Sequence, residues 1–254
     1  MSAAPHVTLV LGAGGPVGKA FHAGVLRAIA ERCGWEARDA DVIVGTSAGA
    51  HIGALLRMGW EASWLEHAAD MSHHGELFRR LLGGPWPHLP LWIPAVHVQS
   101  GARMVFGRDA GPTIDMATAV RCSSAVPLLR TPVAVGAARY VDGGIASPTH
   151  ADLAMHAADA VEHERRTVVI LSPLSRFAPL RWLLRWELRP LLRHGIDIVL
   201  FEPDRDVVAA MGWNPMNARR AAAVTAAAYR ATCVRLQNRE VAKAVCALVG
   251  TGSA

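Results

Sequence analysis

The chain has 254 residues, of which 52% are hydrophobic and 19% are charged. This composition excludes intrinsic disorder and a coiled coil as its main state, because disordered and coiled-coil chains are richer in charged residues. With 26 basic and 21 acidic residues the net charge is +5, which suits an anionic lipid surface or a nucleic acid without choosing between them.

Strand and helix signals alternate in the first part of the chain. The apolar run at residues 7–11 predicts a buried strand, and residues 19–32 carry apolar side chains at helical spacing. Residues 41–45 predict a second buried strand, and a second helix is expected over 47–58. This alternation is typical of a parallel sheet with crossover helices.

Residues 73–111 follow no regular pattern and are rich in Pro, Gly, His and Trp. A stretch of this length is a lid, a binding loop, or a segment whose regular elements are hidden from pattern reading. Within it, residues 81–102 carry no charge, but four prolines argue against a membrane-spanning helix. Its aromatic side chains suit either a loop at a lipid interface or a loop folded over the core.

Regular signals return after residue 111. Helices are expected over 114–123 and from about 150, and strands are expected at 133–135, 139–141, 167–171 and 196–201. One long Ala-rich helix is predicted over 215–248. The chain shows no repeat and no convincing linker, so we predict a single domain over residues 1–254.

A basic segment at residues 175–193 has an arginine at every fourth position from Arg181, together with leucines and the tryptophans Trp182 and Trp186. The pattern predicts an amphipathic helix that ends or kinks at Pro190. Such a helix either lies on an anionic bilayer or packs its leucines on the sheet and exposes a ridge of arginines. We favour the second interpretation.

Residues 45–49 read Gly-Thr-Ser-Ala-Gly, a GxSxG pentapeptide between a predicted strand and a predicted helix. This is the arrangement of a nucleophile elbow, in which Ser47 lies at a helix N-terminus that favours developing negative charge. Gly45 and Gly49 remove side chains that would collide in so tight a turn. Taken alone, the pentapeptide is also explained by a turn that caps a helix, and its two flanks favour the nucleophile.

A serine hydroxyl needs a base to become nucleophilic. Asp142 ends a predicted strand and is followed by Gly143 and Gly144, although Asp-Gly-Gly read alone predicts a hairpin turn. His51 follows Ser47 by four residues on the same helix, where a packing or capping role is expected. Later histidines that fit a Ser–Asp–His order, none of them in a telling context, are His150, His156, His163 and His194.

Three glycines, Gly14, Gly15 and Gly18, lie between the first predicted strand and its helix. Backbone N–H groups at such a helix start can stabilise an oxyanion. A nucleotide-phosphate loop is the competing interpretation, but the glycines do not form GxGxxG and no GK[ST] follows.

In this order and spacing, the motifs together resemble the patatin-like phospholipases, a family of lipid acyl hydrolases. The segments that carry the resemblance are residues 13–18, Phe-His-Ala-Gly-Val-Leu at 21–26, the pentapeptide at 45–49, Arg-Cys-Ser-Ser-Ala-Val-Pro at 121–127, and Tyr-Val-Asp-Gly-Gly at 140–144. The resemblance implies a three-layer α/β fold whose mostly parallel central sheet has helices on both faces. It also implies a Ser47–Asp142 dyad without a catalytic histidine, an oxyanion hole from Gly14 and Gly15, and no metal or organic cofactor.

The glycine loop departs from the family pattern at two positions. Ala13 replaces the first glycine, and Val17 stands where many members carry Arg or Lys, with Lys19 two positions later. Pro16 has no N–H and cannot donate to an oxyanion. The hole therefore rests on Gly14 and Gly15, with Val17 left open as a third donor.

The sequence thus predicts a serine acyl-ester hydrolase that acts on lipid or other hydrophobic esters through an acyl-enzyme. Two alternatives stay open: an α/β-hydrolase with a Ser-His-Asp triad, and a catalytically weak patatin-fold protein that binds lipid or a partner. Peripheral contact with the inner face of the membrane is also left open. We expect no nucleic-acid partner, since the basic residues match no known nucleic-acid motif.

The cysteines Cys33, Cys122, Cys233 and Cys246 are scattered and form no CxxC pair. We therefore expect reduced thiols in a cytoplasmic protein, with neither a disulfide framework nor a zinc site. The first residues lack the basic region and the apolar run of an export signal, which agrees with this expectation.

Overall fold

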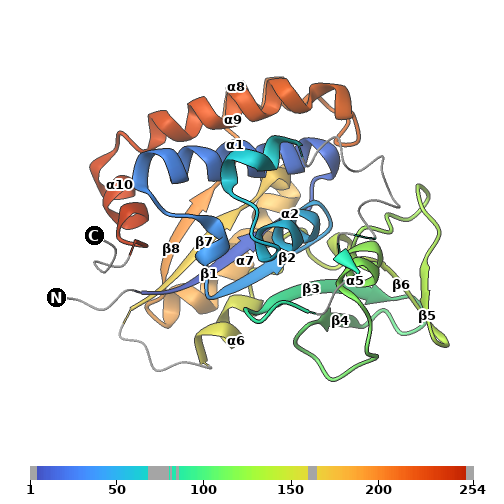
Figure 1. Cartoon of the computed structure of the whole chain (residues 1–254). Helices are drawn as coiled ribbons and strands as arrows, with labels where there is room; N and C mark the ends of the chain where they lie inside the picture. The colour runs from blue at the N-terminus through green and yellow to red at the C-terminus, as the bar shows by residue number, and fades with distance from the viewer. Residues whose placement is uncertain (1–4, 68–79, 81, 84–85, 160–164, 250–254) are drawn as a thin grey trace.

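The computed structural model describes residues 5–67, 80, 82–83, 86–159 and 165–249. At its centre is an eight-stranded sheet with helices on both faces (Figure 1). The strands are β1 (His6–Leu11), β2 (Val42–Gly45), β3 (Leu91–His97), β4 (Arg103–Phe106), β5 (Val133–Val135), β6 (Ala138–Asp142), β7 (Arg166–Leu171) and β8 (Asp197–Phe201). Hydrogen bonds link them in the order β5-β6-β3-β2-β1-β7-β8, and β4 pairs with β3 off this path.

The half of the sheet formed by β3, β2, β1, β7 and β8 is parallel throughout. Its central strands are continuous apolar runs, and β1 and β2 are buried along their whole length. Such runs are typical of parallel strands covered on both faces. The predicted strands at 7–11, 41–45, 167–171 and 196–201 are confirmed, as is the mostly parallel α/β fold.

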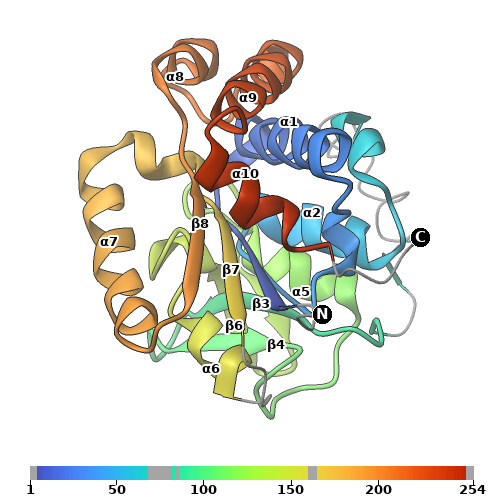
Figure 2. The ribbon, with the colours of Figure 1, turned by 90° about the vertical axis from the view of Figure 1, so that its left-hand side faces the viewer.

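Helices cover both faces of the sheet and give two separate core clusters (Figure 2). The larger cluster lies under α1 (Gly15–Cys33), α2 (Ala48–Arg57), α5 (Met116–Ser123), α8 (Arg205–Met211), α9 (Ala221–Arg235) and α10 (Arg239–Cys246). The smaller cluster lies under α6 (Leu153–Asp159) and α7 (Ala178–Arg193). On the outside of the larger cluster α9 packs on α1, where a side chain at Gly24 would collide with the carbonyl of Thr225.

Of the three interpretations of residues 73–111, the one with hidden regular elements is confirmed, because β3 and β4 lie within them. Residues 68–79, 81 and 84–85, which include the first part of the predicted lid, lie outside the described residues. The side chains of Leu91, Trp92 and Ile93 are buried in the sheet, so they are not available to a lipid interface. In the part of the chain that the structure describes, no helix is both long and apolar enough to cross a membrane.

Pro94 hid β3 from pattern reading, since a proline cannot donate a ladder hydrogen bond. In the structure it lies between two partners of the strand: β2 pairs with Leu91 and Trp92, and β6 pairs with residues from Ala95 onward. The missing N–H therefore falls where one partner strand ends and the next begins.

The packing of α7 confirms the interpretation of the basic segment that we favoured. Leu184, Leu188 and Leu191 are buried against the sheet, while the arginine side chains and both tryptophans are exposed. The helix does not end at Pro190, because it continues to Arg193. The carbonyl that loses its hydrogen bond belongs to Trp186, which is 56% exposed, so water can satisfy it.

The single helix predicted over 215–248 is also wrong. α9 ends at Arg235, and α10 begins after Asn238, whose side-chain oxygen accepts the backbone N–H groups of Glu240 and Val241. Asparagine is a preferred N-cap residue, and this cap starts the second helix. The short helix α8, which is capped in the same way by Asp204, was not predicted.

The expectation of four reduced cysteines is wrong for two of them. Cys33 at the end of α1 and Cys246 at the end of α10 form a disulfide, with their Cα atoms 4.8 Å apart. Since 213 positions separate the two cysteines, their spacing gave no signal. Cys122 and Cys233 are free thiols. The disulfide removes the cysteine argument on which the cytoplasmic expectation rested.

Candidate active site

Ser47 lies in a strained turn between β2 and α2, with φ 53° and ψ −108°. A non-glycine residue rarely adopts a positive φ, and the nucleophile elbow is a turn of this kind. The turn leaves no room for a side chain at either glycine of the pentapeptide. A Cβ at Gly45 would lie 2.6 Å from the carbonyl oxygen of Gly49, and a Cβ at Gly49 would collide with the carbonyl of Leu11.

Asp142 lies near Ser47 because the strands that precede them, β6 and β2, end at neighbouring positions along β3. β4 and β6 both pair with Ala95 and Val96, so they lie on opposite edges of β3. β2 runs parallel to β3 and β6 runs antiparallel to it, so their C-terminal ends approach each other. At the junction, a Cβ on Gly143 would lie 3.3 Å from the methyl group of Thr46.

The hydroxyl group of Ser47 lies beside the carboxyl group of Asp142, close enough to affect its pKa. Both residues are buried, with 6% and 5% of their surface exposed. A carboxylate oxygen of Asp142 also accepts the backbone N–H of Gly144 at 2.7 Å. Burial raises the pKa of Asp142 above its ordinary value, and the nearby Ser47 hydroxyl and the N–H of Gly144 act in the opposite direction. The structure thus brings together the predicted nucleophile and base.

The glycine loop lies against both partners of this pair. The Cβ position of Gly18 is 3.4 Å from the Cβ of Ala48, and that of Gly144 is 3.3 Å from the Cβ of Ala13. Among the described residues, no acceptor bonds the backbone N–H groups of Gly14 and Gly15, which therefore fit the predicted role as oxyanion donors. Val17, which was left open as a third oxyanion donor, is not available for this role, since its N–H donates to the carbonyl of Pro215 at 3.3 Å.

Three polar residues that support the elbow and the loop were not singled out from the sequence. The Oγ of Ser123 accepts the backbone N–H of Ser47 at 3.0 Å, and Ser124 follows it with its Oγ 3.4 Å from the carbonyl oxygen of Ser47. His22 is buried under the glycine loop, with its Nε2 2.8 Å from the carbonyl oxygen of Gly12. The signal for all three was their place inside the quoted motif segments.

The histidines take other positions. The Nδ1 of His51 lies 3.1 Å from the backbone oxygen of Ser47, as expected of a packing or capping residue, and that of His150 lies 3.2 Å from the Oγ1 of Thr46. Burial is the main cause that lowers the pKa of each to about 3. His156 and His194 are exposed, and His163 lies outside the described residues.

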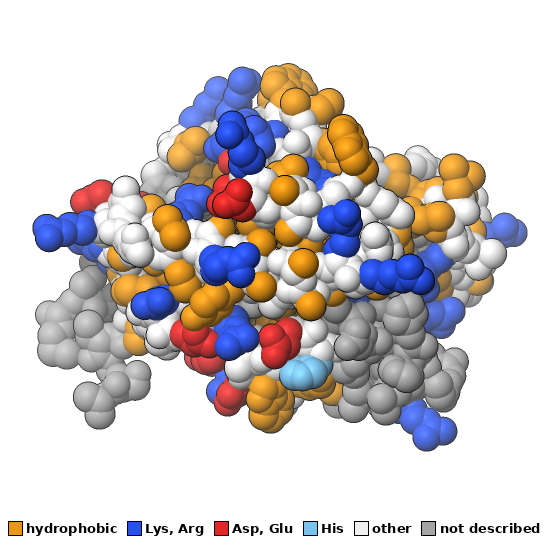
Figure 3. All heavy atoms as spheres, turned by 90° about the horizontal axis from the view of Figure 1, so that it is seen from above, with side chains coloured by type: hydrophobic (Ala, Val, Ile, Leu, Met, Phe, Trp, Pro, Cys, Tyr) orange, Lys and Arg blue, Asp and Glu red, His pale blue; other side chains and the backbone are white. Residues whose placement is uncertain are grey.

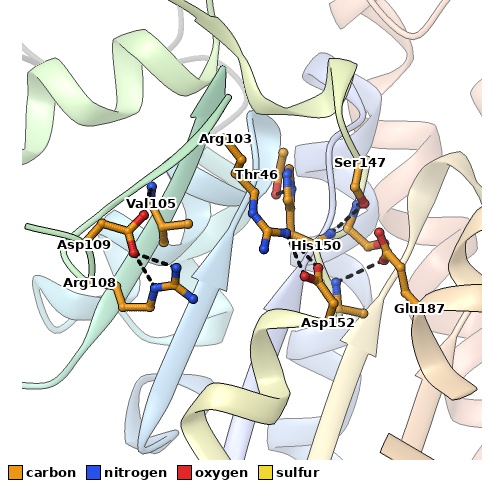
Figure 4. Close-up of polar contacts among 11 residues, drawn as sticks. Thr46, Arg103, Val105, Arg108, Asp109, Ser147, His150, Asp152 and Glu187 are labelled. Atoms are coloured by element: carbon orange, nitrogen blue, oxygen red, sulfur yellow. Dashed lines mark hydrogen bonds and ion pairs between the residues drawn. The ribbon is translucent and has the colours of Figure 1, made fainter. Parts of the chain in front are cut away.

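A polar network on the Thr46 side of the turn holds the loop that follows Asp142 (Figure 4). The buried carboxylate of Glu187, from α7, accepts the hydroxyl of Thr149 at 2.8 Å and the N–H of Ala151 at 3.1 Å. His150, between them, has φ 51° and its N–H donates to the Oγ of Ser147. The sequence signal for Glu187 was weak, a lone acid in a basic helix.

A cavity of about 390 Å³ lies elsewhere, at the Leu91 end of β3. Its lining includes Trp86, Trp92 and Phe106 but neither Ser47 nor Asp142. In the described ranges, no cluster of three or more His, Cys, Asp or Glu side chains is placed to hold a metal ion.

The structure therefore places a strained serine elbow beside a buried carboxyl group at one end of the α/β sheet. The family model described as patatin-like phospholipase matches residues 94–155 and confirms the predicted resemblance to this family of lipid acyl hydrolases. The matched segment contains Asp142, whereas Ser47 and the glycine loop precede it. No curated protein matched the chain significantly.

Proposed function

We propose that this protein is a serine acyl-ester hydrolase that acts on lipid or other hydrophobic esters, with Ser47 as nucleophile and Asp142 as general base. The observation that carries the proposal is the position of the Asp142 carboxyl group beside the Ser47 hydroxyl at the strained elbow. A base hydrogen-bonded to a hydroxyl is the requirement for its activation.

In the proposed reaction, Asp142 takes the proton from the Ser47 hydroxyl while its oxygen attacks the acyl carbonyl. The N–H groups of Gly14 and Gly15 stabilise the oxyanion of the tetrahedral intermediate. Asp142 then returns the proton to the leaving alcohol, and the acyl group stays on Ser47. Asp142 then takes a proton from a water molecule, which attacks the acyl-enzyme and forms a second tetrahedral intermediate. When this intermediate breaks down, the carboxylic acid leaves and Asp142 returns the proton to the oxygen of Ser47.

Exposed apolar side chains next to the site favour a hydrophobic substrate. Leu128 is fully exposed in the loop after α5, whose Ala125 accepts the N–H of Asp142, and Ile145 follows Asp142 with 55% exposure. Met216 reaches Gly15 from the other side, next to Trp213, which is 90% exposed. We define Leu128, Ile145, Trp213 and Met216 as the apolar rim.

Peripheral contact with an anionic lipid surface is part of the proposal. Apolar side chains of this kind insert at lipid interfaces, and the chain carries a net charge of +5. Figure 3 shows basic side chains spread over the face that α1, α8 and α9 form, with acidic ones in fewer places. Sedimentation with anionic vesicles measures the contact, which Leu128→Asp should weaken. The control Leu192→Asp, at an exposed position of α7 on the other face of the sheet, should leave it unchanged.

A fluorophosphonate probe tests the nucleophile without knowledge of the substrate. We expect one covalent adduct, mapped to Ser47 by mass spectrometry, and none in Ser47→Ala. Ser124→Ala is the matched control, because it removes a neighbouring hydroxyl that does not contact Asp142 in the structure. Folded protein that forms no adduct at Ser47 would instead favour the catalytically weak, lipid-binding alternative, which the altered glycine loop motivates.

A further inference from the structure

His22, in the N-terminal half of α1, is fully buried under the glycine loop and makes one polar contact among the described residues. Its Nε2 lies 2.8 Å from the carbonyl oxygen of Gly12. A carbonyl only accepts hydrogen bonds, so Nε2 carries the proton and is the donor. Burial lowers the pKa of His22 to about 4, so the ring is neutral at neutral pH and Nδ1 is unprotonated. The buried ring therefore serves as a single donor to Gly12.

The hydrogen bond from His22 is one of two that hold the peptide group between Gly12 and Ala13. On the other side of this group, the N–H of Ala13 donates to the carbonyl of Pro148 at 2.7 Å. The C=O and N–H of one trans peptide point in opposite directions, so the two bonds together fix its orientation. The preceding N–H, that of Gly12, donates to the carbonyl of Leu171 at 2.9 Å. The chain is thus anchored where it leaves β1.

The proposed oxyanion donors lie in the next two peptide groups. The group between Gly14 and Gly15 is held by α1, because the carbonyl of Gly14 accepts the N–H of Gly18 at 2.9 Å. The group between Ala13 and Gly14 has no hydrogen bond of its own to a described residue. Its orientation depends on the anchored groups before and after it, since glycine leaves the backbone free to rotate. Without the bond from His22, one of these two anchors is weakened.

We propose that His22 is a positioning residue of the oxyanion hole, whose hydrogen bond to Gly12 orients the N–H groups of Gly14 and Gly15 toward the developing oxyanion. The inference rests on the proposed function and adds to it the side chain that holds the donors in place. Oxyanion donors act on the transition state more than on the bound substrate, so a displaced loop lowers kcat and changes KM little. His22 itself lies under the loop and acts through it.

The first test compares two side chains of similar length at this position. In His22→Gln the amide nitrogen is as many bonds from Cβ as the Nε2 of histidine and can donate to Gly12, whereas His22→Met has no donor. With a soluble p-nitrophenyl ester as substrate, we expect kcat to fall about tenfold or more in His22→Met, with KM within about twofold of the wild type. His22→Gln should restore most of kcat. If His22→Met does not fold, His22→Asn takes its place, because its amide is too short to reach Gly12.

The matched control is Thr225→Val, which removes a buried hydrogen bond between α9 and α1. The hydroxyl of Thr225 donates to the carbonyl of Ala20 at 3.2 Å, and valine keeps the shape of the side chain. We expect this variant to lose stability and to keep the wild-type kcat, because the lost bond does not reach the glycine loop. An equal fall of kcat in Thr225→Val and His22→Met, with both proteins folded, would show a general effect on α1 and overturn the proposal.

The second test measures the contact between His22 and the loop without catalysis. Hydrogen exchange followed by NMR reports on the N–H of Ala13, which shares a peptide group with the carbonyl of Gly12 and is bonded to Pro148. We expect this amide to exchange about fivefold faster or more in His22→Met, and close to the wild-type rate in Thr225→Val. Nitrogen chemical shifts of the wild-type ring should show the proton on Nε2 at neutral pH. A proton on Nδ1 would overturn the proposal.

The two tests separate failure of the positioning role from failure of the proposed function. A folded His22→Met with the wild-type kcat overturns the positioning role, and so does a rise in KM alone. A wild-type protein that hydrolyses no ester and forms no adduct at Ser47, while Ala13 exchanges faster in His22→Met, overturns the hydrolase and keeps the contact that orients the loop. Unchanged exchange of Ala13 in His22→Met overturns the orientation of the loop by His22, whatever the activity.

Discussion

Thr46 and Ser47 are neighbours in the sequence, but their hydroxyl groups face two different regions of the molecule. Ser47 lies beside Asp142 at the end of an antiparallel strand, next to the glycine loop and the apolar rim. Thr46, which is fully buried, bonds to His150, and the loop around His150 is tied by Glu187 to α7 on the other face of the sheet.

The contrast explains why the side with the histidine does not carry the proposed chemistry. A histidine with a pKa near 3 is a weak base, and both Thr46 and His150 have no measurable exposed surface. Asp142 has a pKa that burial raises, which makes it a stronger base than an ordinary aspartate. Burial therefore weakens His150 as a base for Thr46 and strengthens Asp142 as a base for Ser47, although histidine is ordinarily the stronger base of the two.

The largest expected effect is that of Asp142→Asn, which should lower kcat/KM by about 10³-fold, the contribution typical of a general base. Asn keeps the shape of the side chain but cannot take the proton of Ser47. In the wild type, activity should be lost as the pH falls through the pKa of Asp142, at a pH above the ordinary range of an aspartate, since burial raises that pKa. A pH profile of kcat/KM measures this acid limb.

The matched control for this change is Asp152→Asn, on the Thr46 side of the turn. Asp152 forms an ion pair with Arg103 at 2.7 Å and lies in the same network as His150. We expect its kcat/KM to stay close to that of the wild type. Equal losses in Asp142→Asn and Asp152→Asn, with both variants folded, would contradict the division between the two sides.

A smaller effect, on stability, is expected of Thr46→Val. The change keeps the shape of the side chain but leaves the Nδ1 of His150 buried without its partner, which costs about 1–3 kcal/mol of the free energy of unfolding. Urea unfolding measures this cost, and Thr46→Ser, which keeps the hydroxyl, is the control. Activity per folded molecule should be retained.

His150→Asn completes the test of this side, because asparagine tolerates the positive φ at this position but is not a base. We expect reduced stability and retained turnover. If turnover were abolished while circular dichroism showed an intact fold, the Ser-His-Asp alternative would replace the dyad.

How far the sequence predicted this arrangement depends on where each contact comes from. The elbow and the glycine loop were predicted because each is built by local residues, such as Gly45 and Gly49, whose spacing is visible in the sequence. Asp142 was found through a motif, but its approach to Ser47 depends on β3, which Pro94 concealed. The role of Glu187 depends on contacts between distant elements, and no local pattern encodes it.

The smallest expected effect is the pH dependence contributed by Glu187. Burial raises the pKa of this carboxyl above its unfolded value, so its contribution to stability is present below the unfolded pKa and is lost as the pH rises through the folded pKa. The free energy of unfolding of the wild type, minus that of Glu187→Gln, should therefore decrease with rising pH. The size of this decrease measures how far burial shifts the pKa of Glu187.

Urea unfolding of both proteins across the acidic and neutral range measures this difference, and the subtraction removes the carboxyl groups that the two proteins share. Glu240→Gln is the control, because that side chain lies in the exposed first turn of α10. A difference that stayed constant with pH for Glu187→Gln would show that the carboxyl titrates alike in the folded and unfolded states. In that case burial would not shift the pKa of Glu187. The network on the Thr46 side would then contain no desolvated acid, and this difference from the exposed apolar rim would disappear.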